Sequence, residues 1–300
     1  MGLTNNQKEL IIAIAENDNQ KINRCVIACL NEDTTAKNSY FKTRYLPLFT
    51  RSAAIIKLPE NLKYKLEALD MKEIFREDRY YLSEENSKIV DEIIRMDNAS
   101  QKLASMQIPY INSTLLYGPS GVGKTTLAQY IAYKLNRPYV YMRFSQLIDS
   151  YMGKTASSIN LAFEYAKRTP CVFLVDELDA IAIKRSASSD SGSDGEMNRI
   201  TITLMQELDN LPNNVILLAT TNRIDRIDEA LLNRFSLKAK MVEPDENEKR
   251  QIIDKYLNTV PLDFDDSVKG AIVRCAMQQN EQRGVVKAII KEIARQVENN

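Results

Sequence analysis

The octapeptide GPSGVGKT, from Gly118 to Thr125, has the residue types and spacing of a phosphate-binding loop, G-x-x-x-x-G-K-[ST]. Its glycines can adopt positive φ angles and so bring backbone N–H groups against phosphate oxygens. We predict that Lys124 reaches the β- and γ-phosphates of a nucleoside triphosphate and that the Thr125 hydroxyl coordinates Mg²⁺. The predicted nucleotide contacts are Gly118, Pro119, Ser120, Gly121, Val122, Gly123, Lys124, Thr125 and Thr126.

The flanking sequence distinguishes this loop from an ordinary glycine-rich turn. Ser113–Tyr117 is a short apolar run that suits a buried strand. Residues 125–135 have apolar side chains at helical spacing and contain neither glycine nor proline. The unpaired N–H groups and the dipole at the start of that helix favour an anion. Strand, loop and helix together predict a nucleotide site, with ATP and Mg²⁺ as cofactors.

An acidic pair follows fifty residues later, in the segment CVFLVDELDAI from Cys171 to Ile181. Asp176 stands at the carboxyl end of an apolar run, where a carboxylate can hold Mg²⁺ through its water shell. The adjacent Glu177 can accept a proton from an attacking water, which disfavours a small-molecule kinase. The alternative is an ordinary strand that ends in a charged turn.

A third apolar run, residues 214–219, ends in Thr-Thr-Asn-Arg. An amide at that strand tip would lie between the two preceding strands, and we predict that Asn222 orients the lytic water. Asparagine after a strand is also a common turn residue. The prediction for Asn222 therefore depends on its place at the third successive strand end, after the phosphate loop and the acidic pair.

Alternating strands and helices must position these side chains. The predicted strands are Ser113–Tyr117, Tyr139–Phe144, Cys171–Asp176, Asn214–Thr220 and Leu237–Val242, with helices between them, as in a parallel sheet covered on both faces. Residues 5–31 predict two helices broken near residues 16–19, with Pro47 and Pro59 as later breaks. We therefore expect three parts: an N-terminal helical module and linker at 1–75, a nucleotide-binding domain at 76–245 and a helical lid at 246–300.

With these motifs in order, residues 80–298 resemble an AAA ATPase module. GPSGVGKT resembles the Walker A motif, LVDELDAI the Walker B motif and LLATTNR the sensor 1 motif. The resemblance implies an α/β P-loop NTPase fold with a five-stranded parallel sheet and a C-terminal helical lid. It also implies self-assembly into a ring, usually a hexamer.

Two arginines gain roles from the same resemblance. Arg234, in IDEALLNRF, matches the arginine finger that enters a neighbouring subunit's site, although Asn233 replaces a second arginine found in many members. Arg283 resembles the sensor 2 arginine of the lid, which reaches the γ-phosphate. A surface ion pair for Arg234 and a solvated helix start for Arg283 are the alternatives.

The segment Tyr151-Met152-Gly153 resembles the pore loop of protein-translocating members of the family. Aromatic side chains can grip an extended polypeptide between its own side chains, while glycine permits the loop to move. Tyr151 would be a core residue in the alternative interpretation. The flexible, acidic tract at 186–196 falls where a second pore loop is expected, and its charge suits polypeptide better than a phosphate backbone.

Composition limits the remaining classes of function. The chain of 300 residues has 40 Lys plus Arg and 40 Asp plus Glu, so no overall charge points to nucleic acid or to a membrane. It contains no histidine, which excludes Ser-His-Asp catalysis and histidine-containing zinc sites. The four cysteines are predicted to be buried, reduced thiols. The start of the chain has no signal-peptide pattern, and we expect a cytoplasmic protein.

The leading hypothesis is a Mg²⁺-dependent ATPase that works as a ring and remodels or unfolds a polypeptide drawn through a central pore. The alternative is a DNA-directed AAA ATPase, of the helicase-loader or transposition-regulator type, in which basic residues such as Lys154 and Arg143 line a nucleic-acid path. A third possibility is a scaffold that binds ATP but turns it over slowly.

Overall fold

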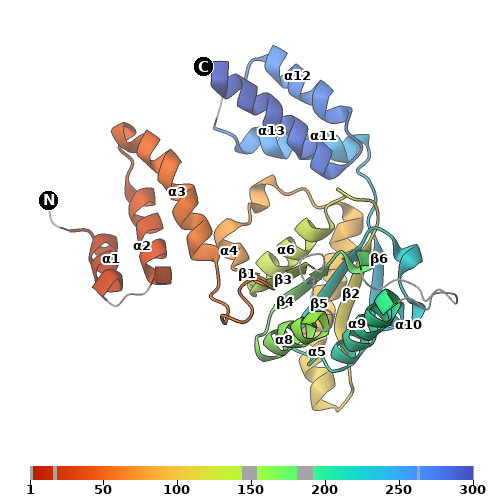
Figure 1. Ribbon diagram of the computed structural model, residues 1–300. Helices are drawn as coiled ribbons and strands as arrows, with labels where there is room; N and C mark the ends of the chain where they lie inside the picture. The colour runs from red at the N-terminus through yellow and green to blue at the C-terminus, as the bar shows by residue number, and fades with distance from the viewer. Residues whose placement is uncertain (1–2, 16–18, 144–153, 181–191, 262–263, 300) are drawn as a thin grey trace.

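The computed structural model describes residues 3–15, 19–143, 154–180, 192–261 and 264–299 (Figure 1). The strands are β1 (Glu67–Leu69), β2 (Asn112–Tyr117), β3 (Tyr139–Arg143), β4 (Val172–Asp176), β5 (Ile216–Thr221) and β6 (Leu237–Lys240). The helices before β4 are α1 (Asn5–Ala15), α2 (Asn19–Glu32), α3 (Ser39–Ala54), α4 (Met71–Ile74), α5 (Glu84–Ser105), α6 (Lys124–Leu135) and α8 (Lys154–Arg168). Those after it are α9 (Gly192–Asp209), α10 (Glu229–Leu232), α11 (Glu246–Thr259), α12 (Asp266–Met277) and α13 (Gln282–Asn299). No described helix is long and apolar enough to span a membrane.

The five predicted strands are present and form the parallel part of a sheet ordered β1-β3-β4-β5-β2-β6. The predicted α/β fold is therefore confirmed, but the strand number is six rather than five. The additional strand, β1, pairs antiparallel with the edge strand β3 and lies before residue 76, where only helix and linker were expected. A three-residue strand is too short to produce a periodic pattern, so only its pairing partner reveals it.

Apolar side chains cover both faces of the sheet, which explains the continuous apolar runs in the sequence. Successive residues point to opposite faces: Phe173 packs in a cluster with α8 and α9, and Leu174 packs in a cluster with α5 and α6. In register, Tyr117 of β2 is opposite Thr221 of β5. The carboxyl ends of neighbouring parallel strands thus meet at one edge of the sheet.

Helices α11, α12 and α13 form a lid with an apolar cluster of its own, separate from the clusters of the sheet (Figure 1). Helix α11, the first of the lid, begins at Glu246, where Asp245 and Glu248 form a reciprocal capping box. Helix α11 ends at Thr259, directly before Val260 and Pro261.

Helices α1, α2 and α3 lie at the N-terminal end, and only Ala13 and Cys25 are buried among their described side chains (Figure 1). Arg24 of α2 connects them to the sheet domain through Asp70 and Glu73, at 3.8 Å each. The prediction that Pro47 breaks the helix is wrong, since α3 continues through it. Packing of α3 against α2 and α4 can outweigh a local cost of about 3 kcal/mol.

Candidate nucleotide site

The loop from Gly118 to Gly123 connects β2 to α6 at the carboxyl edge of the sheet. Its glycines at 118, 121 and 123 all have positive φ, at 149°, 83° and 96°. Helix α6 begins at Lys124, and its N-terminus has no side-chain cap because Gly123 occupies the capping position. The N–H groups of the first helical turn are therefore left to an anion, as a phosphate site requires.

Lys124 is buried beneath this loop. Its Nζ donates hydrogen bonds to the carbonyls of Gly118 and Pro119, both at 2.7 Å, and to Oδ1 of Asn222 at 2.8 Å. The structure thus brings the lysine of the loop and the amide at the β5 tip together, which the order of strand tips predicted.

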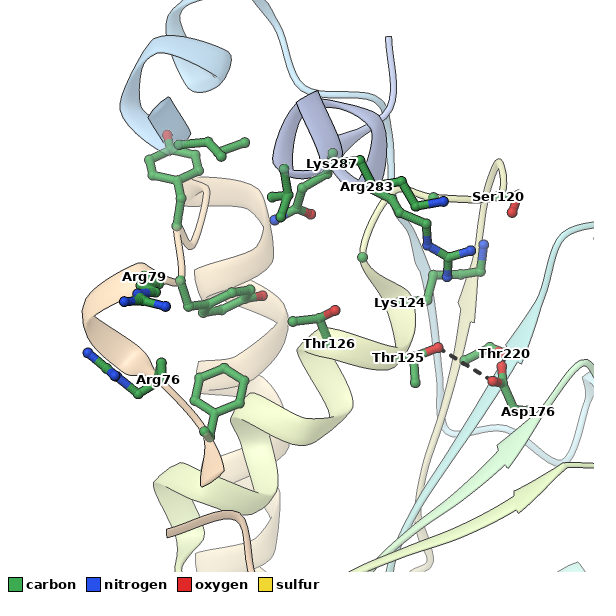
Figure 2. Close-up of a pocket in the computed structure, with 18 of the residues that line it drawn as sticks. Arg76, Arg79, Ser120, Lys124, Thr125, Thr126, Asp176, Thr220, Arg283 and Lys287 are labelled. Carbon is green, nitrogen blue, oxygen red and sulfur yellow. Dashed lines mark hydrogen bonds between the residues drawn. The ribbon is translucent and has the colours of Figure 1, made fainter. Parts of the chain in front are cut away.

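Asp176, at the end of β4, faces the start of α6. Its Oδ2 accepts a hydrogen bond from the Thr125 hydroxyl at 3.4 Å, and its Oδ1 accepts one from Thr220 (Figure 2). Oδ2 also accepts a hydrogen bond from Tyr141 at 3.0 Å. Glu177 is exposed and has a φ of 59°, which is rare for a residue with a side chain. Glu177 also borders the same cavity, so the predicted pair lies beside the predicted phosphate loop.

Asp179 is a residue that sequence reasoning missed. Its Oδ1 accepts hydrogen bonds from the Thr221 hydroxyl at 2.8 Å and from the backbone N–H of Asn222 at 3.2 Å. The carboxylate therefore fixes the tip of β5 on which Asn222 stands. Its place three residues after Asp176 was the available signal, because a turn after β4 can bring it over the neighbouring strand.

A cavity of about 480 Å³ extends from the phosphate loop to the lid. Its polar end contains Lys124, Thr125, Thr126, Asp176, Glu177 and Asn222. Its other end is more apolar and is lined by Ile74, Phe75, Tyr80, Ile252, Tyr256 and Val286. The segment before α5 supplies part of that end, although the sequence motifs named no site residue there. The aromatic residues Phe75, Tyr80 and Tyr81 within this otherwise charged segment were the signal that could have identified it.

The shape and donor set fit a magnesium–nucleoside triphosphate. The loop and the α6 N-terminus supply N–H groups for phosphates, Lys124 supplies a positive charge, and the oxygens of Thr125 and Asp176 are ligands that Mg²⁺ accepts. The apolar end offers aromatic surface to a base: the rings of Phe75 and Tyr80 meet edge to face, with centroids 5.4 Å apart.

Residues 114–241 match the family described as "ATPase family associated with various cellular activities (AAA)". These residues form an AAA domain. The domain includes β2 through β6, together with the phosphate loop, the acidic pair and the β5 tip.

Three proteins illustrate what this chain is similar to. The ATP-dependent zinc metalloprotease FtsH of Parabacteroides distasonis is 33% identical over 184 residues. The 26S proteasome regulatory subunit 6A of Saccharomyces cerevisiae is 32% identical over 216 residues, and proteasome-activating nucleotidase 1 of Haloferax volcanii is 33% identical over 215 residues. The matches cover 60%, 69% and 70% of this chain but 27%, 50% and 52% of the three relatives.

The lid touches the phosphate loop of the AAA domain directly. The backbone N–H of Arg283 donates to the carbonyl of Gly121 at 2.9 Å, and its side chain extends toward Lys124 (Figure 2). Burial lowers the pKa of Lys124, and the positive charge of Arg283 lowers that pKa further, although two nearby carboxylates oppose both effects. Arg283 thus lies beside the phosphate loop and lines the same cavity, while its role as a sensor 2 arginine stays a prediction.

Arg234 stands apart from the other predicted site residues of the AAA domain. Its Nε donates to both carboxylate oxygens of Asp209, at 3.0 and 3.1 Å, and its Nη1 donates to the Ala230 carbonyl at 2.8 Å. It is not among the described residues that line the cavity. The predicted pore loop, Tyr151 to Gly153, lies outside the described residues.

Proposed function

We propose that this AAA domain binds Mg²⁺ and ATP in the cavity between the phosphate loop and the lid, and that it hydrolyses the ATP. The observation that carries the proposal is the convergence of Lys124, Asp176 and Asn222, from α6, β4 and β5, on one cavity that Glu177 also borders. Polar groups from the start of α6 and from the ends of two strands border this space, and each matches one requirement of phosphoryl transfer to water.

Each side chain has one task in the proposed reaction. Lys124 would leave the loop carbonyls and donate to the phosphates, where its charge balances the negative charge that develops. Thr125 and Asp176 would hold Mg²⁺, which neutralises phosphate oxygens when bound. Glu177 would take the proton of the attacking water, and Asn222 would orient that water. The lid would keep bulk water from the site.

We further propose that copies of this chain assemble into a ring, as a hexamer, and share their sites. Arg234 supports this view, because its side chain is partly exposed and outside its own cavity. An arginine inserted from a neighbour contributes roughly 10³–10⁵ in rate. Within a single chain Arg234 pairs with Asp209. In the proposed ring it would leave that carboxylate and enter the neighbouring subunit's site.

The proposed substrate is a polypeptide, which the ring would remodel or unfold through a pore lined by Tyr151, Met152 and Gly153. The support is the similarity to a metalloprotease and to proteasome-activating nucleotidases, whose names indicate work on proteins. The test compares ATP-dependent unfolding of a tagged fluorescent protein by the natural chain and by Tyr151→Ala. We expect Tyr151→Ala to hydrolyse ATP and to unfold nothing.

Two further measurements separate this proposal from its alternatives. Turnover stimulated by single-stranded DNA but by no unfolded polypeptide would favour the DNA-directed hypothesis. Electron microscopy of Glu177→Gln with ATP should show rings, because a variant that cannot hydrolyse ATP keeps the assembled state. Monomers alone under those conditions would contradict the shared site.

A further inference from the structure

Four hydrogen bonds hold the Asp176 carboxylate, and two come from hydroxyls that the sequence motifs did not identify. Tyr141 of β3 donates to Oδ2 at 3.0 Å, the same oxygen that Thr125 contacts. Thr220 of β5 contacts Oδ1, and the backbone N–H of Glu177 donates to that oxygen at 3.2 Å. Both neighbouring strands thus clamp the end of β4.

Thr220 also contacts the second member of the acidic pair. Its hydroxyl donates to Asp176 and accepts from the backbone N–H of Glu177 at 3.2 Å, so that one buried oxygen joins both residues. Glu177 has the left-handed φ of 59°, a conformation that persists only where surrounding contacts hold it. The Thr220 hydroxyl is one such contact, and it decides the direction in which the Glu177 side chain leaves the backbone.

We propose that Tyr141 and Thr220 are positioning residues for the acidic pair: Tyr141 orients the carboxylate of Asp176 toward Mg²⁺, and Thr220 sets Asp176 and Glu177 relative to each other. The inference rests on the proposed Mg²⁺ and ATP site. Neither residue needs to touch the nucleotide, because each acts through a carboxylate or a backbone N–H. Residues that orient metal ligands in this way typically change metal affinity or activity by roughly 10–100-fold when altered.

Tyr141→Phe removes one hydroxyl and keeps the ring. We expect the Mg²⁺ concentration that half-saturates ATP binding to rise by about tenfold. Affinity for ATP without Mg²⁺ should stay unchanged, because the phosphate loop is intact. The matched control is Tyr139→Phe, two residues earlier on the same strand. Its hydroxyl is buried and makes none of the hydrogen bonds to Asp176 found in the described part of the chain, so binding and turnover should equal those of the natural chain.

Thr220→Val keeps the side-chain shape and removes the hydroxyl, whereas Thr220→Ser keeps the hydroxyl. We expect Thr220→Val to lower kcat by roughly 10–100-fold with little change in KM, and Thr220→Ser to restore most of the rate. A purely structural role of Thr220 would instead lower the thermal stability of Thr220→Val and leave the kcat of the folded variant unmoved. Thermal unfolding without nucleotide measures that component separately.

The measurement is titration of a fluorescent ATP analogue with and without Mg²⁺, followed by steady-state turnover. If Tyr141→Phe and Thr220→Val both match the natural chain in Mg²⁺ dependence and kcat, the positioning role is overturned. If the natural chain itself binds the analogue equally with and without Mg²⁺, the proposed magnesium site fails instead. The two failures are therefore distinguishable.

Discussion

Replacement of Gly121 by alanine tests the contact between the phosphate loop and the lid. Gly121 has a φ of 83°, and a side chain in this left-handed region costs about 1–2 kcal/mol. The new Cβ would also lie 2.1 Å from Oε2 of Glu281, which is exposed and can rotate away at a cost of about 0.5–1.5 kcal/mol. We therefore expect Gly121→Ala to lower the free energy of unfolding by about 1.5–3.5 kcal/mol.

Binding should respond as well, because the loop must regain its left-handed conformation before its N–H groups can meet a phosphate. A conformational cost of about 1–2 kcal/mol weakens ATP binding by a factor of about 5–30. Urea unfolding without nucleotide measures the first effect, and titration with ATP measures the second. The matched control is Gly270→Ala within α12, where no positive φ is recorded and alanine should stabilise the helix by about 0.5–1 kcal/mol.

A double-mutant cycle isolates the lid contact. In a Glu281→Ala background the part of the Gly121→Ala cost that comes from the Glu281 carboxylate should disappear, which gives a coupling of about 0.5–1.5 kcal/mol, whereas the contact with the Cβ of residue 281 at 3.0 Å should stay. The backbone part should remain. The reasoning is refuted if Gly121→Ala costs less than about 0.5 kcal/mol, the range of an ordinary surface substitution, or if its cost is identical with and without Glu281.

Three further predictions concern catalysis, stability and thiol chemistry. Arg234→Ala should lower ATP turnover by roughly 10³–10⁵ while nucleotide affinity stays constant, and turnover near the natural rate would contradict a shared site. Arg137 is largely buried and donates two hydrogen bonds to the Asp97 carboxylate, both at 2.8 Å. Asp97→Ala removes this carboxylate and should reduce the free energy of unfolding in urea by about 3–5 kcal/mol. A loss below about 1 kcal/mol would argue against a contribution of this pair. Burial raises the pKa of Cys171 to about 12, so alkylation at pH 8 followed by mass spectrometry should label this thiol only after unfolding, and rapid labelling of the native chain would be inconsistent with the core.

Much of the fold was predictable, because the central strands β4 and β5 are apolar runs between helices. The glycines of GPSGVGKT have positive φ, and their spacing together with the flanking apolar patterns located the loop between β2 and α6. The position of β1 was not predictable in this way, since its residues carry no pattern and its pairing with β3 depends on the whole sheet. Helix α3 passed through Pro47 because tertiary packing outweighed a local preference.

The site was predictable in part. The sequence pattern located three site residues: Lys124 directly after the loop glycines, Asp176 at the end of β4 and Asn222 directly after β5. Parallel strands bring their carboxyl ends to one edge of the sheet, which places these residues together. The free cysteines among the described residues also agree with the expectation of reduced thiols, although Cys29 and Cys275 are only half-buried. Tyr141 could not be identified, because its contact with Asp176 depends on how β3 and β4 align.

The central claim is that the cavity beside Asp176 hydrolyses ATP with Glu177 as the base. The most direct test measures Mg²⁺–ATP affinity and steady-state turnover of Glu177→Gln in the same preparation. Loss of the proton acceptor should lower turnover by roughly 10²–10⁴, while affinity stays that of the natural chain, because Glu177 does not hold the phosphates. Unchanged turnover, or equal loss of binding and turnover, would contradict the assignment.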